Sequence, residues 1–173
     1  MKSALILAVT GLAFLPNILA ASAPSCYGSG KAVLTNYWVT KEGTEDMDND
    51  GNTVYLTGPK TVALKDTSGN TIEMVAQTTF DKCNMEGTCL LLSSKMVNLV
   101  SNKKFDSIDR KSAPYGLGSN DKVLVPFVSI ASNDLPKGST VYMTELDGMK
   151  LPNGKTHNGC VRVDDESWSF NGL

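Results

Sequence analysis

Hydrophobic and polar positions alternate along this chain in short segments, and the three-to-four-residue period of a helix is almost absent. Segments rich in Val, Thr, Ile, Leu and aromatic residues recur at short spacing, separated by turn sequences such as Asn-Asp-Gly-Asn and Ser-Gly-Asn. The pattern predicts strands over residues 32–40, 53–57, 61–65, 71–80, 90–99, 122–131, 140–146 and 159–163. Many short strands at this spacing predict an all-β domain, either a barrel or a sandwich.

Local structure follows from the same pattern. The segments 61–65 and 71–74 alternate on either side of Asp-Thr-Ser-Gly-Asn, which predicts a hairpin with its turn at residues 66–70. Helical structure is expected as small turns at most, over residues 78–83 and near residues 93–95.

The first twenty residues have the pattern of an export signal. Lys2 gives a positive start, residues 4–15 form an apolar segment, and Ile18 and Ala20 suit cleavage after Ala20. The apolar segment is too short to anchor the chain in a bilayer, and no second one follows. We therefore expect a signal peptide at residues 1–20 and one secreted, extracellular, monomeric domain at residues 21–173, with no membrane partner.

Charge and cysteine content narrow the class further. Loss of Lys2 changes the formal net charge from −2 to −3, so we expect no attraction to nucleic acid. Cysteines of an exported chain meet an oxidising compartment, so two disulfides are expected, with three possible pairings. Two of the four cysteines flank a short loop that a disulfide could close; the candidates are Cys26, Cys83, Cys89 and Cys160. There is no Cys-x-x-Cys pair and one histidine, so neither a metal nor another cofactor is expected.

One acidic segment has the spacing of a calcium loop. Asp46, Asp48 and Asp50 precede Gly51 at positions one, three, five and six of such a loop. Position twelve is Thr57 rather than a bidentate Glu, and no helices are predicted on either side. An acidic turn before a strand is the interpretation that this pattern favours.

The last predicted strand leads into three carboxylates. Alternation along Cys-Val-Arg-Val places Val161 and Val163 inward, and then Asp164 and Glu166 on one face with Asp165 on the other. An inward Asp165 could have a raised pKa and act as an acid or a base. Alternatively, these carboxylates cap the end of the strand and accept hydrogen bonds from turn amides. Both interpretations remain open.

Two further kinds of residue bear on function. His157, the single histidine, lies in a turn-rich approach to the same strand, as a hydrogen-bonded loop residue or as part of the same groove. No Gly-x-Ser-x-Gly sequence accompanies it, which disfavours a serine hydrolase. Aromatic faces can stack on sugar rings, although most aromatics in a small domain belong to its core; the candidates are Tyr37, Trp38, Tyr115, Trp168 and Phe170.

Several segments form a recognisable combination. They are Asn-Tyr-Trp-Val-Thr from residue 36, Met-Glu-Gly-Thr from 85, Pro-Phe-Val-Ser-Ile-Ala from 126, Lys-Gly-Ser-Thr-Val-Tyr from 137, Leu-Asp-Gly from 146, Leu-Pro-Asn-Gly from 151 and the run from His157 to Gly172. Together they resemble secreted, largely fungal proteins with a three-aspartate (3D) domain, of the type found at the end of the lytic transglycosylase A family. The resemblance implies a six-stranded double-psi β-barrel, as in expansin and barwin, with a 3D-like core over residues 112–173.

The resemblance also implies roles for particular residues. The family's first aspartate follows a Ser-x-Ala strand, where Asp134 is the match, and its second corresponds to Asp165, with Gly172 seven residues later. The third, which the lytic enzymes use as acid and base, lies on a strand after that glycine, and the sequence ends at Leu173 without it. The resemblance therefore implies a protein that lacks the usual catalytic acid.

Three functions follow as expectations. The first is a secreted, non-catalytic, effector-like protein that binds or loosens cell-wall polysaccharide. The second is a lytic glycosidase in which Asp165 is the catalytic acid and base. The third is a module that binds a host or extracellular protein, such as a protease inhibitor. The expected ligand-binding residues are Asp134, His157, Asp164, Asp165, Trp168 and Glu86.

Overall fold

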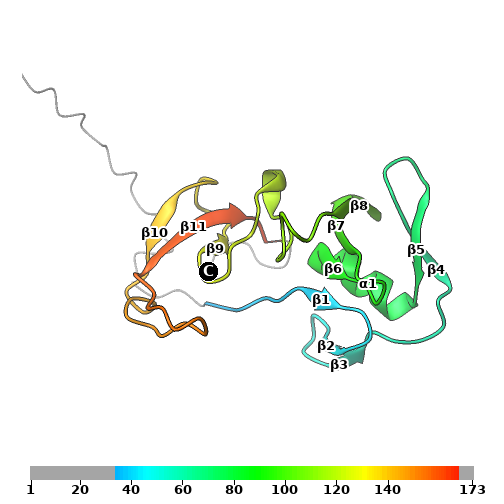
Figure 1. Cartoon of the computed structure of the whole chain (residues 1–173), viewed down its shortest axis with the longest axis horizontal. Coiled ribbons are helices and arrows are strands. Elements are labelled where there is room, and N and C mark those ends of the chain that lie inside the picture. Colours follow the sequence, from blue (N-terminus) through cyan, green and yellow to red (C-terminus); the bar gives the residue numbers. More distant parts are fainter. Residues whose placement is uncertain (1–33, 168–173) are drawn as a thin grey trace, which may run out of the picture. The chain divides into compact units, whose positions relative to one another are not determined.

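The computed structural model describes residues 34–167, which are mostly β-structure with one short α-helix (Figure 1). The predicted signal peptide, Cys26 and Trp168 lie outside these residues. The expectation of a β-rich protein is confirmed, and its strands belong to three separate sheets.

The largest sheet has six strands in the order β1-β6-β7-β8-β4-β5. Its pairs β1–β6 and β4–β8 are parallel, and the other pairs are antiparallel. The strands are β1 (Thr40–Lys41), β4 (Val62–Lys65), β5 (Thr71–Val75), β6 (Thr88–Leu90), β7 (Met96–Ser101) and β8 (Lys104–Ile108).

The predicted hairpin over residues 61–74 is confirmed. β4 and β5 pair antiparallel, from Val62 opposite Val75 to Lys65 opposite Thr71. In the turn between them, Oδ1 of Asp66 accepts a hydrogen bond from the backbone N–H of Asn70 at 2.8 Å. Its Oδ2 accepts one from the Asn70 side-chain amide at 3.0 Å, so the turn residues fix the register of the hairpin.

The helix α1 (Gln77–Glu86) is longer than the helical turn expected at residues 78–83, and it replaces the second half of the strand expected at 71–80. The hydroxyl of Thr79 donates to the carbonyl of Leu56 at 3.1 Å, which ties a β-branched residue of low helix propensity to the rest of the fold. Gly87 has φ of +82° and closes the helix by donating to the carbonyl of Cys83 at 3.0 Å. Tertiary contacts and this glycine thus stabilise a helix in a segment whose local propensity for helix is weak.

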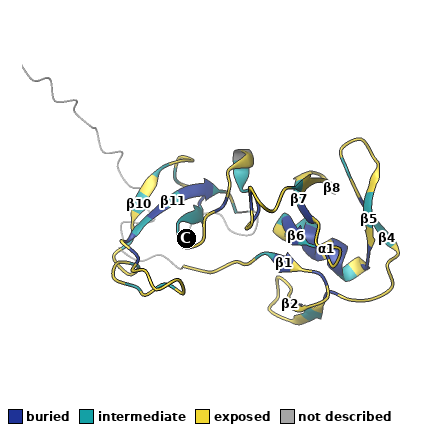
Figure 2. Cartoon of the chain, viewed as in Figure 1, coloured by how far each residue is buried: buried dark blue, intermediate teal, exposed yellow. Residues whose placement is uncertain are grey.

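A hydrophobic core lies between α1 and the large sheet, where Figure 2 shows buried residues on α1, β6 and β7. Phe80 and Phe105 meet edge to face with their ring centroids 6.1 Å apart. A disulfide joins Cys83 of α1 to Cys89 of β6, which confirms the pairing that their spacing suggested. The remaining core residues are Leu64, Val75, Leu91 and Val97.

The other two sheets are small. β2 (Glu45–Met47) and β3 (Thr53–Tyr55) form an antiparallel hairpin. The three-stranded sheet has the order β10-β11-β9, in which β11 pairs antiparallel with β10 and parallel with β9. Its strands are β9 (Ser129–Ala131), β10 (Thr140–Tyr142) and β11 (Cys160–Asp165), and the short 3-10 helix η2 (Ser119–Asp121) precedes them.

Over residues 34–167 these sheets do not close into the barrel that the resemblance implied. The edge strands β1 and β5 of the large sheet do not pair with each other, and neither do β9 and β10 of the three-stranded sheet. The strand expected at 90–99 is instead two strands, β6 and β7, separated by a turn. In this turn the carbonyl of Leu91 accepts a hydrogen bond from the N–H of Ser94, and the N–H of Leu91 donates to the carbonyl of Lys95. Of the strand expected at 122–131, only Ser129–Ala131 forms a strand, and Val123 makes an isolated antiparallel bridge with Leu117.

Candidate functional site

Asp164 lies on β11 with 2% of its surface exposed. Arg162 donates to both of its oxygens, from Nε to Oδ1 at 2.6 Å and from Nη2 to Oδ2 at 2.9 Å. The hydroxyl of Ser129 donates to Oδ2 at 2.5 Å. Burial raises the pKa of Asp164, but the hydrogen bonds from Arg162 and Ser129 and the charge of Arg162 outweigh it, so the pKa lies below its ordinary 3.8. At neutral pH this carboxylate is an ionised acceptor and has no proton to donate.

Asp165 is half-buried and accepts three hydrogen bonds at Oδ1. Two come from the backbone N–H and the hydroxyl of Ser119, and one from the backbone N–H of Glu166, each at 2.9 Å. Gly118 packs so closely against the strand that a Cβ there would lie 2.5 Å from the carbonyl oxygen of Asp164. The carboxylate of Asp165 therefore attaches the segment at Gly118 and Ser119 to the end of β11.

Of the two aspartates, the structure buries Asp164 and leaves Asp165 half-buried. Val161 and Val163 are buried, as the alternation predicted. Val163 lies opposite Ile130 of β9, but Asp165 lies opposite the next residue of that strand, so β11 contains a bulge at Asp164. Asp164 shares a face with Arg162, whose guanidinium it binds, and the hydroxyl of Ser129 on β9 also contacts it, so the buried aspartate is Asp164 and not Asp165, which simple alternation placed inward.

His157 is buried and both of its ring nitrogens are hydrogen-bonded. Nδ1 accepts from the backbone N–H of Gly159 at 2.8 Å, which leaves the proton of the neutral ring on Nε2. Nε2 lies 2.5 Å from the carbonyl oxygen of Phe127 and donates to it in that tautomer. His157 thus joins the approach to β11 to the segment before β9, in agreement with the interpretation as a hydrogen-bonded loop residue.

Asp134 follows β9, at the end of the sheet where Asp165 ends β11. The backbone N–H of Ser132 donates to the carbonyl of Asp165 at 3.0 Å, and the side chain of Asn133 exchanges two hydrogen bonds with the backbone of Ser167. The structure therefore brings together the chain segments that carry Asp134 and Asp165, the two positions matched to the family's aspartates.

Tyr37 lies within the electrostatic reach of both aspartates. Burial among neighbouring atoms, and then the negative charges of Asp165 and Asp164, raise its pKa from 10.0 to about 12. Half of the Tyr37 surface nevertheless remains exposed. The phenol is thus a neutral hydroxyl at physiological pH, beside the carboxylate pair.

Tyr37 and its neighbour Trp38 both line a surface hollow of about 140 Å³. Trp38 is 52% exposed, and Glu86 of α1, one of the predicted ligand-binding residues, lines the same hollow. Amide, thioether and charged groups complete the lining, which consists of Asn36, Tyr37, Trp38, Met47, Asp48, Asn49, Lys82 and Glu86.

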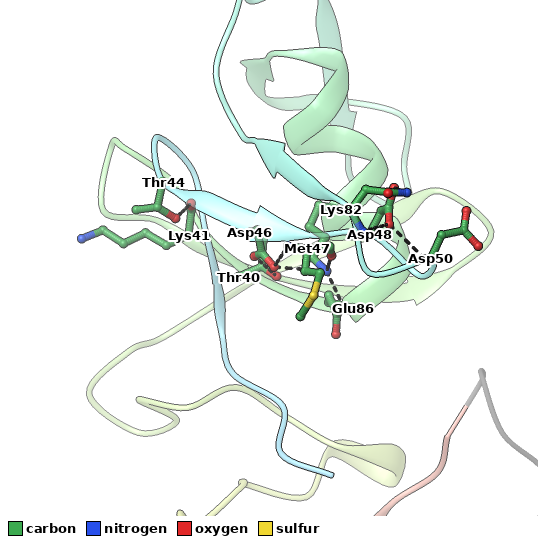
Figure 3. Close-up of polar contacts among 10 residues, drawn as sticks. Thr40, Lys41, Thr44, Asp46, Met47, Asp48, Asp50, Lys82 and Glu86 are labelled. Atoms are coloured by element: carbon green, nitrogen blue, oxygen red, sulfur yellow. Dashed lines mark hydrogen bonds and ion pairs between the residues drawn. The ribbon is translucent and has the colours of Figure 1, made fainter.

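Lys82 supports this hollow from inside the protein and is 6% exposed. Its Nζ lies 3.2 Å from Oδ1 of Asp46 and 2.8 Å from Oε1 of Glu86, and it donates to the carbonyl of Met47 (Figure 3). Asp46 is itself buried and accepts from the hydroxyl of Thr40 at 3.3 Å. This network fixes the helix carrying Glu86 against the β2–β3 hairpin.

The calcium-like spacing belongs to the turn of that hairpin. Oδ1 of Asp48 accepts from the backbone N–H groups of Asp50 and Asn52, at 2.9 and 2.8 Å. The hydrogen bonds from Asn52 hold the pKa of Asp48 below its ordinary 3.8. Because Asp46 pairs with Lys82, these aspartates do not converge, and residues 34–167 contain no group of acidic, histidine or cysteine side chains that could hold a metal ion. The interpretation as an acidic turn is supported.

Three features of these sites were not predicted from the sequence: the buried Lys82, the ion pair of Arg162 with Asp164, and the position of Tyr37 near the aspartates. Lys82 and Glu86 are four residues apart, a spacing that would have indicated an ion pair had the helix been predicted at its full length. Arg162 and Asp164 are two residues apart on one strand, which places them on the same face. No local pattern indicates the position of Tyr37, because that contact spans most of the chain.

Comparisons with protein-family models, with curated proteins and with solved structures found no match to this chain. Within residues 34–167, no helix has the length and apolar character needed to cross a membrane. Cys160 is not part of a disulfide among these residues.

Proposed function

We propose that the protein is secreted, effector-like and non-catalytic, and that it binds or loosens cell-wall polysaccharide through the hollow beside Trp38. One observation carries the proposal: the exposed indole of Trp38 shares a small hollow with two carboxylates and two asparagine amides. The apolar C–H face of a sugar ring can pack on the indole, while the polar groups bind its hydroxyls.

The carboxylate pair on β11 supports a non-catalytic role. A glycosidase needs a carboxylic acid that still carries its proton near neutral pH. Arg162 and Ser129 keep Asp164 ionised, and Asp165 accepts three hydrogen bonds from Ser119 and Glu166. Both carboxylates therefore serve as acceptors that hold the end of β11 in place.

A relationship to the 3D domain is part of the same proposal, with sheets that stay open over residues 34–167. Its support is the three-stranded sheet, which lies within the 3D-like core over residues 112–173 and pairs β9 parallel with β11. The segments that carry Asp134 and Asp165 meet at one end of this sheet. These are the two positions that the resemblance compares with aspartates of the 3D domain.

Secretion is supported by two features. Residues 1–20 have the pattern of an export signal. The disulfide between Cys83 and Cys89 is of a kind that persists in oxidising compartments.

Retention on insoluble polymers tests the function. Purified residues 21–173 are incubated with chitin, glucan, cellulose and peptidoglycan, and the bound fraction is measured for the wild type, Trp38→Ala and Tyr115→Ala. Tyr115 is also half-exposed but is not part of the hollow, so its loss controls for removal of a surface aromatic. We expect retention on at least one polymer that Trp38→Ala loses and Tyr115→Ala keeps. Retention on none of them, with capture of an extracellular protein instead, would support the protein-binding function.

A further inference from the structure

The charge of the Trp38 hollow indicates what kind of sugar it accepts, an inference that rests on the proposed function. Three carboxylates lie in or directly behind the hollow, those of Asp46, Asp48 and Glu86, against the one ammonium of Lys82. Three negative charges and one positive charge leave a formal charge of −2. An acidic sugar would be repelled from this surface, and a cationic one attracted.

The single ammonium is committed to the interior. Nζ of Lys82 has three acceptors, from Asp46, Glu86 and Met47, and the residue is 6% exposed. Lys82 therefore has little capacity to bind an acceptor on a ligand. The carboxylate of Glu86 has 28% of its side chain exposed, and Asp48 is exposed, so negative charge is what the hollow presents to solvent.

Carboxylates only accept hydrogen bonds, so the best partner for this surface is a group rich in donors. A protonated amine offers three N–H donors and a positive charge, whereas an acetamido group offers one donor, an acceptor and extra bulk. A cation beside the exposed indole of Trp38 gains a further attraction to the ring face. Ring stacking and amine recognition are thus available within one hollow.

We propose that the hollow binds a non-acetylated, cationic amino-sugar unit of a polysaccharide, with the sugar ring on Trp38 and its ammonium facing the carboxylates of Glu86 and Asp48. The volume of about 140 Å³ suits one sugar ring, so the hollow binds one unit of the polysaccharide at a time. The amides of Asn36 and Asn49 bind ring hydroxyls.

Calorimetry with oligosaccharides of equal length tests this inference. The probes are glucosamine oligomers, N-acetylglucosamine oligomers and cello-oligosaccharides, together with a lysine-rich peptide of matched charge. We expect the glucosamine oligomers to bind at least about tenfold more tightly than the acetylated ones, and this preference to shrink at high salt. Equal or weaker binding of glucosamine oligomers, or equally tight binding of the peptide, would overturn the inference.

Matched variants separate the site from general charge. The double variant Glu86→Gln/Asp48→Asn removes two carboxylates from the hollow, while Asn at position 48 keeps an oxygen acceptor for the hairpin turn. The control Asp106→Asn/Asp109→Asn removes two carboxylates from a separate cavity of about 310 Å³. The preference for glucosamine should fall to about equality in the first and persist in the second. The single variant Glu86→Gln, which leaves the turn intact, should lose part of the preference for glucosamine. If both Glu86→Gln and the double variant keep the full preference, the hollow is not the site that recognises the amine.

The outcomes also distinguish this inference from the function on which it rests. Trp38-dependent binding of neutral and cationic oligomers alike overturns the amino-sugar preference and leaves polysaccharide binding standing. Failure of every oligosaccharide and polymer to bind overturns both.

Discussion

The guanidinium of Arg162 faces both carboxylate oxygens of Asp164, two residues farther along β11, with N–O distances of 2.6 and 2.9 Å. Asp164 is buried at a bulge, so Arg162 and Ser129 provide the polar contacts that water would otherwise make. The end of β11 is thus held by a structural ion pair.

This pair predicts a component of acid unfolding. Because the pKa of Asp164 in the folded protein lies below its ordinary 3.8, ionised Asp164 stabilises the fold fully above that pH. Its contribution is lost as the pH falls through the folded-state pKa. Asp164→Asn should therefore be less stable than the wild type at neutral pH, and the two should converge in strong acid. Thermal unfolding from about pH 2 to pH 7 measures the difference; a constant gap across that range would contradict the ion-pair role.

The buried Lys82 predicts a large loss of stability on substitution. Lys82→Met would leave the carboxylate of Asp46 buried without its cation, at a cost of about 3 to 5 kcal/mol in the free energy of unfolding. Lys41→Met, at an exposed lysine of β1, should change it little. Urea unfolding measures both, and adding Asp46→Asn to Lys82→Met should recover part of the loss. No recovery in the double variant would show that the two groups are not coupled.

The contacts of His157 predict a structural role rather than a catalytic or ligand-binding one. His157→Ala leaves the buried N–H of Gly159 without its acceptor, which should cost about 1 to 3 kcal/mol. Lys155→Ala, in the exposed turn just before it, serves as the control. Unfolding by urea reports the stability, and polymer retention below the transition should match the wild type. Lost retention with unchanged stability would instead place His157 in the binding site.

The disulfide pairing predicts the result of peptide mapping without reduction. One linked peptide should contain both Cys83 and Cys89. Because the loop that the disulfide closes is short, loss of the disulfide in Cys83→Ala/Cys89→Ala should lower the free energy of unfolding by about 2 kcal/mol. A peptide linking Cys83 or Cys89 to Cys160 would contradict the fold around α1.

Local patterns predicted the elements that local chemistry determines. The β4–β5 hairpin depends on the turn from Asp66 to Asn70, and the inward positions of β11 depend on the alternation of Val161 and Val163. In these places the residues that form the structure are neighbours in sequence. The Cys83–Cys89 disulfide belongs to the same class, because a short loop limits the possible partners.

Elements that depend on distant contacts were not predicted. Helix α1 contains Thr79, which favours a strand locally, but its hydroxyl binds the carbonyl of Leu56 across the fold. The burial of Asp164 depends on how β11 pairs with β9, whose residues lie more than thirty positions earlier. The hollow beside Trp38 forms where α1 and the β2–β3 hairpin meet residues 36–38. The sequence pattern predicted only that these residues belong to a strand.

Product analysis on the polymer that retains the protein tests the central claim most directly. Purified residues 21–173 are incubated with that polymer, and the soluble fraction is examined by mass spectrometry beside Trp38→Ala and Asp165→Asn. We expect retention that depends on Trp38 and a soluble fraction with no sugar products from any variant. Soluble anhydro-sugars that appear with the wild type and vanish with Asp165→Asn would contradict it, and would make the protein a lytic enzyme.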